Sequence, residues 1–296
     1  MGFRTFKQRT SPPLIANASP QLRSVACQSH WSLTEYVCSA GPHDRVFEEQ
    51  HDRVSIALVV SGTFRYRTDA GEAILYPGAF LLGNAGACYE CGHEHSHGDR
   101  CLALHIDPEL FLEIAAGASR SNRTPFRTAS LPALSELIVL SVSLLQPATS
   151  QLALEETIFA LIRKIVPAAG TNHRRPRQPG PAAIRRISRV LEFIDNHLER
   201  EMSLAHLSRL AAMSQYHFLR TFKRATGLTP HQYILGRRLR RTAIALRATH
   251  SPVARVAADQ GFGDLSTFNH TFRRVIGLTP TEFRSHPSDG TSSEFV

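Results

Sequence analysis

The chain carries one segment twice: FLRTFKRATGLTP at residues 218–230 returns as FNHTFRRVIGLTP at residues 268–280, fifty positions further on. Each copy places two phenylalanines four residues apart, which puts them on one face of a helix. Both copies end in Gly-Leu-Thr-Pro, where glycine ends one helix and Thr-Pro begins another. The repeat therefore predicts two amphipathic helices with matching boundaries and different exposed side chains.

Each of these helices follows a shorter predicted helix and a tight turn. The first unit runs over 203–211, a turn, and 214–226, and the second runs from Ser251-Pro252 to Val275. Ser214 and Asp264 are residue types that cap helix N-termini, and Gly261 suits a turn position that disfavours a side chain. The pattern predicts two helix-turn-helix units.

A single helix is expected between the two units, from Pro230 to about Arg247. At about 1.5 Å per residue it spans roughly 27 Å. Successive major grooves on one DNA face lie about one turn, roughly 34 Å, apart. The spacing thus favours tandem recognition by one chain. The connecting helix also carries basic side chains that either reach phosphates or form an ordinary solvated face: Arg237, Arg238, Arg240 and Arg241.

Charge is distributed unevenly along the chain. Residues 182–285 hold 17 Lys and Arg against 7 Asp and Glu, whereas residues 1–173 hold 14 against 16. The C-terminal part is therefore near +10 and the N-terminal part near −2. A basic module beside a neutral one indicates a polyanionic partner for the C-terminal part.

The N-terminal half has the sequence pattern of β-strands. Residues 54–87 are rich in Val, Ile, Phe and Tyr, with turn signals at Ser61-Gly62, 69–71 and Pro77-Gly78, as in short antiparallel strands. This part is expected to form a small β-barrel or sandwich. From Leu131 onward, apolar residues fall at helical spacing in two stretches, which predicts two amphipathic helices. These helices either cover the barrel or also pair with a second subunit, giving a homodimer.

The second unit resembles a known family. The run AADQGFGDLSTF at 257–268, with Phe272-Arg273-Arg274, GLTP at 277–280 and Phe283-Arg284, is similar to the AraC/XylS signature. The resemblance covers about 100 residues. It implies a seven-helix DNA-binding domain that activates transcription through RNA polymerase when an N-terminal cupin-like domain senses a signal. Residues 51–107 look like that cupin-type half.

The resemblance also implies roles for individual residues. Base-reading positions of the family fall on Tyr216, Leu219, Arg220, Leu265, Ser266, Asn269 and His270. Arg220 suits guanine and Asn269 suits adenine. His270 departs from the arginine common at its position, which leaves the preference of the second unit open. Side chains expected near phosphates are Lys223, Arg224, Arg237, Arg241, Arg273 and Arg274.

The expected fold class is α+β: a cupin-like β-barrel with two following helices, then an all-α domain of two helix-turn-helix units joined by a long helix. We interpret residues 1–20 as a disordered leader, 21–170 as a sensor and oligomerisation domain, 171–183 as a linker, 184–286 as the DNA-binding domain and 287–296 as a tail. No apolar run approaches the roughly 18 to 20 residues that cross a bilayer, and no secretion signal is recognisable. An odd cysteine count fits the reducing cytoplasm better than a disulfide framework.

A dense group of cysteines and histidines lies within 88–101. It offers candidate ligands for zinc or another transition metal, with His51 able to join from across the barrel: Cys88, Cys91, His93, His95 and Cys101. A turn could bring both thiolates of the Cys-x-x-Cys together, and residues two apart on a strand share a face. Four interpretations of the group stay open: a metal-responsive sensor, a redox sensor, a structural zinc site and a reduced loop without a ligand.

Two other functions compete with a specific regulator. Cupin barrels can hold catalytic metals, so one alternative is a metal enzyme with an appended DNA-binding domain. No complete catalytic constellation is recognisable, and we expect no enzymatic activity. The second alternative is a nonspecific architectural DNA-binding protein, which charge alone would allow. The effector, the target site and the direction of regulation are not encoded in any motif.

Overall fold

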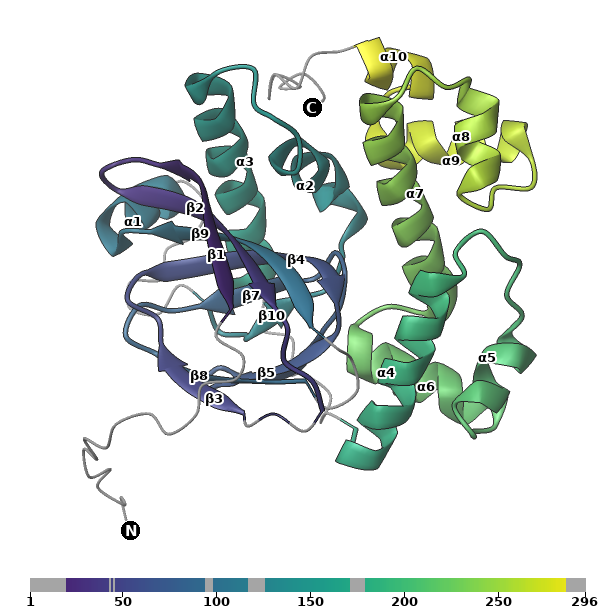
Figure 1. Ribbon diagram of the computed structural model, residues 1–296, viewed down its shortest axis with the longest axis horizontal. Coiled ribbons are helices and arrows are strands. Elements are labelled where there is room, and N and C mark those ends of the chain that lie inside the picture. The colour runs from purple at the N-terminus through teal and green to yellow at the C-terminus, as the bar shows by residue number, and fades with distance from the viewer. Residues whose placement is uncertain are drawn as a thin grey trace.

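The protein folds into a β-rich N-terminal domain beside a helical C-terminal domain (Figure 1). The structure is a computed structural model that describes residues 20–42, 44, 46–93, 98–116, 126–170 and 179–285. Most of the expected leader and linker and all of the expected tail lie outside these residues. Among the described helices, none is long and apolar enough to cross a membrane.

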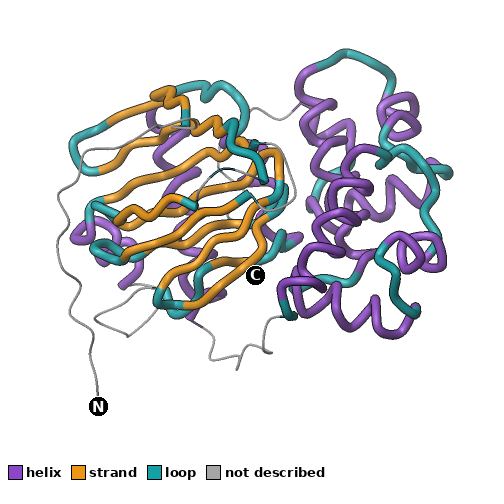
Figure 2. The backbone as a smooth tube through the Cα atoms, turned by 60° about the horizontal axis from the view of Figure 1, so that its bottom comes forward, coloured by secondary structure: helices purple, strands orange, loops and turns teal. Residues whose placement is uncertain are grey.

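The N-terminal domain contains two antiparallel sheets. One has six strands in the order β1-β2-β9-β4-β7-β10 and the other has four in the order β3-β8-β5-β6. The strands are β1 (Gln21–Cys27), β2 (Trp31–Cys38), β3 (Phe47–Gln50), β4 (Val54–Gly62), β5 (Phe64–Thr68), β6 (Gly71–Leu75), β7 (Phe80–Gly83), β8 (Cys88–Gly92), β9 (Asp99–Ile106) and β10 (Ser130–Leu131). The sheets face each other without closing into a continuous barrel (Figure 2). The predicted strand pattern of residues 54–87 is confirmed.

The central strands of the six-stranded sheet, β4, β7 and most of β9, are buried on both faces. Alternate residues of β4 such as Ala57 and Val59 face the four-stranded sheet, while Ile56 and Leu58 face the opposite way. That second face packs against α1 (Pro108–Ala116) and α3 (Gln151–Gly170). Burial on both sides explains why β4 shows a continuous apolar run in place of strict alternation.

The helices after the sheet differ in detail from the expectation. Leu131 belongs to β10, and the first predicted helix begins as a short 3-10 turn, η1 (Ser135–Leu137), before α2 (Ile138–Leu144). The second predicted helix is α3. The sequence reasoning missed α1, whose nine residues carry an apolar stripe too short to separate from a strand by pattern alone.

The described part of the C-terminal domain, residues 179–285, contains seven helices, as the resemblance implies. They are α4 (Pro181–Asn196), α5 (Leu204–Leu210), α6 (Gln215–Thr226), α7 (Pro230–Ala248), α8 (Val253–Asp259), α9 (Leu265–Ile276) and α10 (Pro280–Ser285). The fold class is confirmed: two helix-turn-helix units, α5-α6 and α8-α9, are joined by the long helix α7 (Figure 1).

The local signals at the ends of these helices act as predicted, with one exception. Gly227 and Gly277 end α6 and α9 in the left-handed conformation, with φ of 79° and 89°. Gly261 has a φ of 86°, and a Cβ there would lie 2.4 Å from the carbonyl oxygen of Leu198. The exception is the start of the second unit at Ser251-Pro252, where we expected serine to cap the helix and proline to be its first residue. Instead α8 begins at Val253, and Pro252 is its N-cap residue, without a side-chain hydrogen bond.

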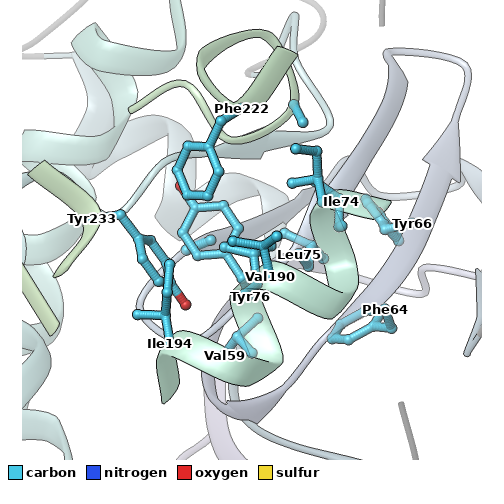
Figure 3. Close-up of a cluster of buried hydrophobic side chains, with 14 of the residues drawn as sticks. Val59, Phe64, Tyr66, Ile74, Leu75, Tyr76, Val190, Ile194, Phe222 and Tyr233 are labelled. Carbon is cyan, nitrogen blue, oxygen red and sulfur yellow. The ribbon is translucent and has the colours of Figure 1, made fainter. Parts of the chain in front are cut away.

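The two domains share their cores. Val59, Leu75 and Tyr76 of the β-domain belong to one buried cluster with Val190 of α4 and Phe222 of α6 (Figure 3). A second cluster joins α2 of the β-domain to α7, α8 and α9. Each helix-turn-helix unit is therefore packed against the N-terminal domain.

Candidate nucleic-acid interface and β-domain cavity

The first unit presents a polar face away from its core. Ser203 and Ser214 cap α5 and α6 by accepting hydrogen bonds from the backbone amides of His206 and His217 at 3.1 and 3.4 Å. Both phenylalanines of α6 are fully buried, so the opposite side of the helix faces solvent. Exposed on that side are Tyr216, His217, Arg220 and Lys223.

Within this face, Arg220 and Tyr216 lie together. The Tyr216 side chain is 72% exposed, and the Arg220 guanidinium lies 5.8 Å from its ring centroid. Stacking of this kind orients a guanidinium without consuming its hydrogen-bond donors. Leu219 is only half-buried, and its side chain lines a groove against Met202 and Ile234. Of the three base-reading residues implied for α6, Leu219 is therefore the least available.

The second unit repeats the scaffold with different side chains. Asp264 caps α9 by accepting a 2.6 Å hydrogen bond from the amide of Thr267, and hydrogen bonds from this segment lower its pKa. Phe268 and Phe272 are fully buried. The implied base-reading residues of this helix are all exposed: Leu265, Ser266, Asn269 and His270.

The structure separates the expected phosphate-binding residues into two groups. Lys223, Arg241, Arg273 and Arg274 are exposed, and Arg224 is half-buried. Arg237 faces α4, where its Nε donates to Asp195 Oδ1 at 2.7 Å and its side chain is 12% exposed. This pairing turns Arg237 toward a neighbouring helix, which argues against the expected phosphate contact.

Two further arginines of α7 also donate hydrogen bonds within the protein: Arg238 is half-buried and Arg240 is buried. Arg238 donates to the backbone carbonyls of Leu198 and Arg200 at 2.8 and 2.7 Å. Arg240 is 4% exposed and donates a long 3.4 Å hydrogen bond to the carbonyl of Gly78, in the β-domain. Only Arg241 of the four is exposed.

The contact between the domains combines apolar packing with few polar groups. Tyr76 is fully buried, stacks edge-on against Tyr233 of α7 at 5.3 Å and donates a 2.5 Å hydrogen bond to the carbonyl of Thr226 (Figure 3). Burial lowers the pKa of Arg240 to about 9, so this side chain keeps its charge at neutral pH. Its Nε has no hydrogen-bond partner among the described residues.

A pocket of about 110 Å³ lies between the two sheets of the β-domain. Its walls come from both sheets and include histidine, tyrosine and cysteine side chains. The side chains of His51 and Tyr66 are joined by a 2.7 Å hydrogen bond, and burial followed by the charge of His105 lowers the pKa of His51 to about 4. His105 contacts Tyr36 and Ser55, and burial lowers its pKa as well.

The predicted metal ligands divide between the inside and the outside of this pocket. Cys91, His93 and Cys101 line it, whereas Cys88 is exposed. The two thiols of the Cys-x-x-Cys lie on the extended strand β8, where residues three apart point to opposite faces, so no turn brings them together. His95 lies outside the described residues.

Two residues that the sequence reasoning missed complete the group around His93. His93 Nε2 lies 2.5 Å from Asp99 Oδ1, and Cys38 lies beside them. Burial would lower the pKa of His93, but hydrogen bonds to Asp99 and Cys38 raise it to about 9. Burial raises the pKa of the Cys91 and Cys101 thiols. Cys38 lies on β2, whose alternating pattern predicts that its side chain faces inward. That pattern points to the site only once the pairing of β2 with β9 places Cys38 opposite Asp99.

Comparison with family models gives two matches. A model described as an AraC-like ligand binding domain matches residues 32–162, and one described as a helix-turn-helix domain matches residues 207–286. The first segment runs from β2 into α3 of the β-domain, and the second runs from within α5 to the end of α10.

Similar proteins agree with these matches. The probable transcriptional regulator LumQ of Photobacterium leiognathi is 36% identical over 103 residues, which are 34% of this chain and 42% of LumQ. The regulatory protein SoxS of Salmonella typhimurium is 32% identical over 98 residues, covering 33% of this chain and 92% of SoxS. A solved structure of the DNA-binding domain of AdpA with a target DNA is 27% identical, with a TM-score of 0.33, covering 33% of this chain and 89% of that domain.

These matches support a regulator over a cupin-type metal enzyme or an architectural DNA-binding protein. The likeness to SoxS extends over nearly the whole of that protein, while the chain spans less than half of LumQ. With a ligand-binding and a helix-turn-helix match in one chain, the protein belongs to the AraC family of transcription regulators.

Proposed function

We propose that this protein binds one asymmetric DNA sequence as a single chain, with α6 and α9 in successive major grooves. The observation that carries this proposal is that two helices of the same length, each with a side-chain N-cap and a glycine C-cap, expose different side chains. Tyr216 and Arg220 are exposed on α6, where Ser266 and His270 occupy the corresponding positions of α9. A nonspecific binder would gain nothing from such a difference.

Arg220 is the residue we assign to guanine, because a guanidinium can donate two hydrogen bonds to O6 and N7. Asn269 has the donor and acceptor pair that suits adenine. The exposed cations at the ends of α6 and α9 and on α7 set affinity through phosphate contacts: Lys223, Arg241, Arg273 and Arg274. Arg224 has a smaller part, since it is half-buried.

The β-domain regulates this binding through the cores that it shares with both units. A change in the pocket between the sheets can reach α6 through Tyr76 and Phe222, which belong to the same buried cluster as Cys91 and Cys101. We infer that the signal alters how readily the two units, held at one spacing by α7, bind DNA. Activation through RNA polymerase, a homodimeric state and a cytoplasmic location belong to this proposal.

The proposal is tested by selecting bound sequences from random duplexes with the full chain and then footprinting the best one. We expect a discrete site with protection of roughly two adjacent major grooves per chain, about one helical turn apart. Arg220→Ala and Asn269→Ala should each relax the selected sequence in a different half of the site. Uniform protection, or selection without a consensus, would contradict specific tandem binding.

A further inference from the structure

Five side chains with metal-binding atoms line the pocket of the β-domain. Ligand atoms of Cys38, His93 and Asp99 all lie within 4.8 Å of one another. The Cys101 thiol donates to Asp99 Oδ2 at 3.0 Å, and Cys91 lines the same pocket from the four-stranded sheet. The group therefore offers three thiols, one imidazole and one carboxylate.

Strand register, and not a local loop, brings these residues together. Cys38 of β2 is the direct cross-strand partner of Asp99 on β9, and Cys101 follows two residues later on the same face. Cys91 and His93 are likewise two residues apart, on and just after β8. The site thus joins the facing surfaces of both sheets.

The surroundings fit a desolvated metal centre. The exposed fraction is 7% for Cys38 and Cys91, 6% for His93 and Cys101, and 8% for the side chain of Asp99. Phe64, Ala57 and Leu81 supply an apolar wall. Tetrahedral ligands at about 2.0 to 2.3 Å from zinc lie roughly 3.3 to 3.8 Å from one another. The ligand atoms of Cys38, His93 and Asp99, all within 4.8 Å of one another, are therefore near the spacing of such a shell.

We propose that Cys38, Cys91, His93, Asp99 and Cys101 bind one thiophilic transition-metal ion of zinc type. Thiolate and imidazole ligands favour such an ion over magnesium or calcium, which take oxygen ligands. Cys38, His93 and Asp99 form the close part of the site, and the thiols of Cys101 and Cys91, which lie outside that 4.8 Å group, would approach to complete the shell. The Asp99 carboxylate either binds the ion or orients His93 through their hydrogen bond. Cys88 has no part in this site, because it lies on the opposite face of β8.

Metal binding would also act on the helical domain, a consequence that rests on the proposed function. The ion would tie the six-stranded sheet to β8 of the other sheet, and β8 pairs with β5, next to β6. The chain leaves β6 directly into Tyr76, which contacts α6 and α7. Loss or gain of the ion is thus expected to change DNA affinity.

The site is tested on the full chain, purified without an affinity tag under reducing conditions and titrated with Co²⁺ or Zn²⁺. We expect about one ion per chain after gel filtration, with Co²⁺ giving thiolate charge-transfer bands and the intense visible bands of tetrahedral coordination. Cys38→Ser and Asp99→Asn should each weaken binding at least about tenfold, since even outer-shell partners are worth that much. Two control variants at exposed cysteines, Cys88→Ser on β8 and Cys27→Ser on β1, should bind the metal ion as tightly as the unmodified chain does.

Three results would overturn the site. One is the absence of thiolate bands in the unmodified chain; the second is loss of metal in Cys88→Ser with retention in Cys38→Ser. The third is a disulfide among the pocket cysteines that persists under these reducing conditions. Circular dichroism and the unfolding midpoint identify variants that misfold. If the variants do misfold, the Co²⁺ spectrum of the unmodified chain still tests whether the metal site exists.

The regulatory consequence is measured separately. DNA affinity of the metal-free and Zn²⁺-loaded chains should differ at least about fivefold, the lower range of allosteric coupling. Equal affinities would remove the coupling and leave the metal site standing. A chain that binds Co²⁺ but selects no DNA sequence would contradict the proposed function alone.

Discussion

The hydroxyl of Tyr76 donates a 2.5 Å hydrogen bond to the carbonyl of Thr226, joining residues 150 positions apart. Tyr76 directly follows β6, an edge strand of the four-stranded sheet, and Thr226 is the last residue of α6. The bond lies inside a fully buried cluster, where a hydrogen bond is not exchanged with water. It therefore ties the β-domain to α6 at a defined point.

Removing this hydroxyl should loosen the contact between the domains. Tyr76→Phe keeps the ring contact with Tyr233 but leaves the Thr226 carbonyl without this donor, at a cost of about 1 kcal/mol. Native-state hydrogen exchange should show faster exchange of amides in both β6 and the C-terminal turn of α6. The control is Tyr233→Phe, which removes a 3.0 Å bond to Asp195 within the helical domain. Equal acceleration at β6 in both variants would contradict the assignment.

The native Arg240 side chain is expected to destabilise the contact between the two domains, because it is a buried cation with one long hydrogen bond. We expect Arg240→Met to stabilise the domain contact by about 1 kcal/mol or more, since burying an uncompensated charge costs more than burying a thioether. DNA affinity should not fall, as Arg240 does not face the DNA-binding surface. Arg241→Met is the matched control: it should lower DNA affinity and leave domain stability unchanged. The reverse pattern, with Arg240→Met lowering DNA affinity, would place Arg240 on phosphate.

Arg220 and Lys223 should affect DNA binding in different ways. Arg220→Ala is expected to cost about 1 to 3 kcal/mol on the selected site and to relax sequence preference at one base pair. Lys223→Ala should weaken binding to all sequences and reduce the slope of log affinity against log salt by about one. Affinities measured over a salt series on specific and random duplexes separate the two. Identical behaviour of both variants would show that the division of roles is wrong.

His51 should make the β-domain sensitive to acid. Its pKa is lowered from 6.5 to about 4 in the folded chain, so the unfolded chain takes up the proton first as pH falls. The contribution of neutral His51 to the free energy of unfolding is complete above pH 6.5. As pH falls toward 4, this contribution is lost, which lowers the free energy of unfolding by up to roughly 3 kcal/mol. Urea unfolding between pH 7 and pH 5 should show a smaller loss for His51→Gln than for the unmodified chain. An unchanged pH dependence in that variant would exclude His51 as the group responsible.

The sequence predicts the helical domain well because its signals are local. The capping residues Ser214 and Asp264 act on amides three positions away, and the capping box of Thr229 and Gln232 spans one turn. The paired phenylalanines share a helix face through spacing alone. Elements and their boundaries could therefore be derived from short windows of residues.

The candidate sites are predicted less well, because they depend on contacts between distant segments. Nothing near Arg237 in the sequence indicates that Asp195 lies beside it, and Gly78 approaches Arg240 across 162 positions. Cys88 and Cys91 fit a turn or a strand equally by spacing, and only the pairing of β8 with β3 and β5 selects the strand. Cys38 joins the pocket through the register of β2 against β9.

The most direct measurement of tandem recognition is the affinity of the full chain for its selected site with base pairs inserted between the two halves. Because α7 holds α6 and α9 at a fixed spacing, five extra base pairs, about half a turn, should place the second groove on the wrong face. Ten extra base pairs, about one turn, restore the face but exceed the reach of one rigid chain. We expect both insertions to lower affinity at least about tenfold. Full affinity with either insertion would show that the two helices do not read adjacent grooves as one rigid unit.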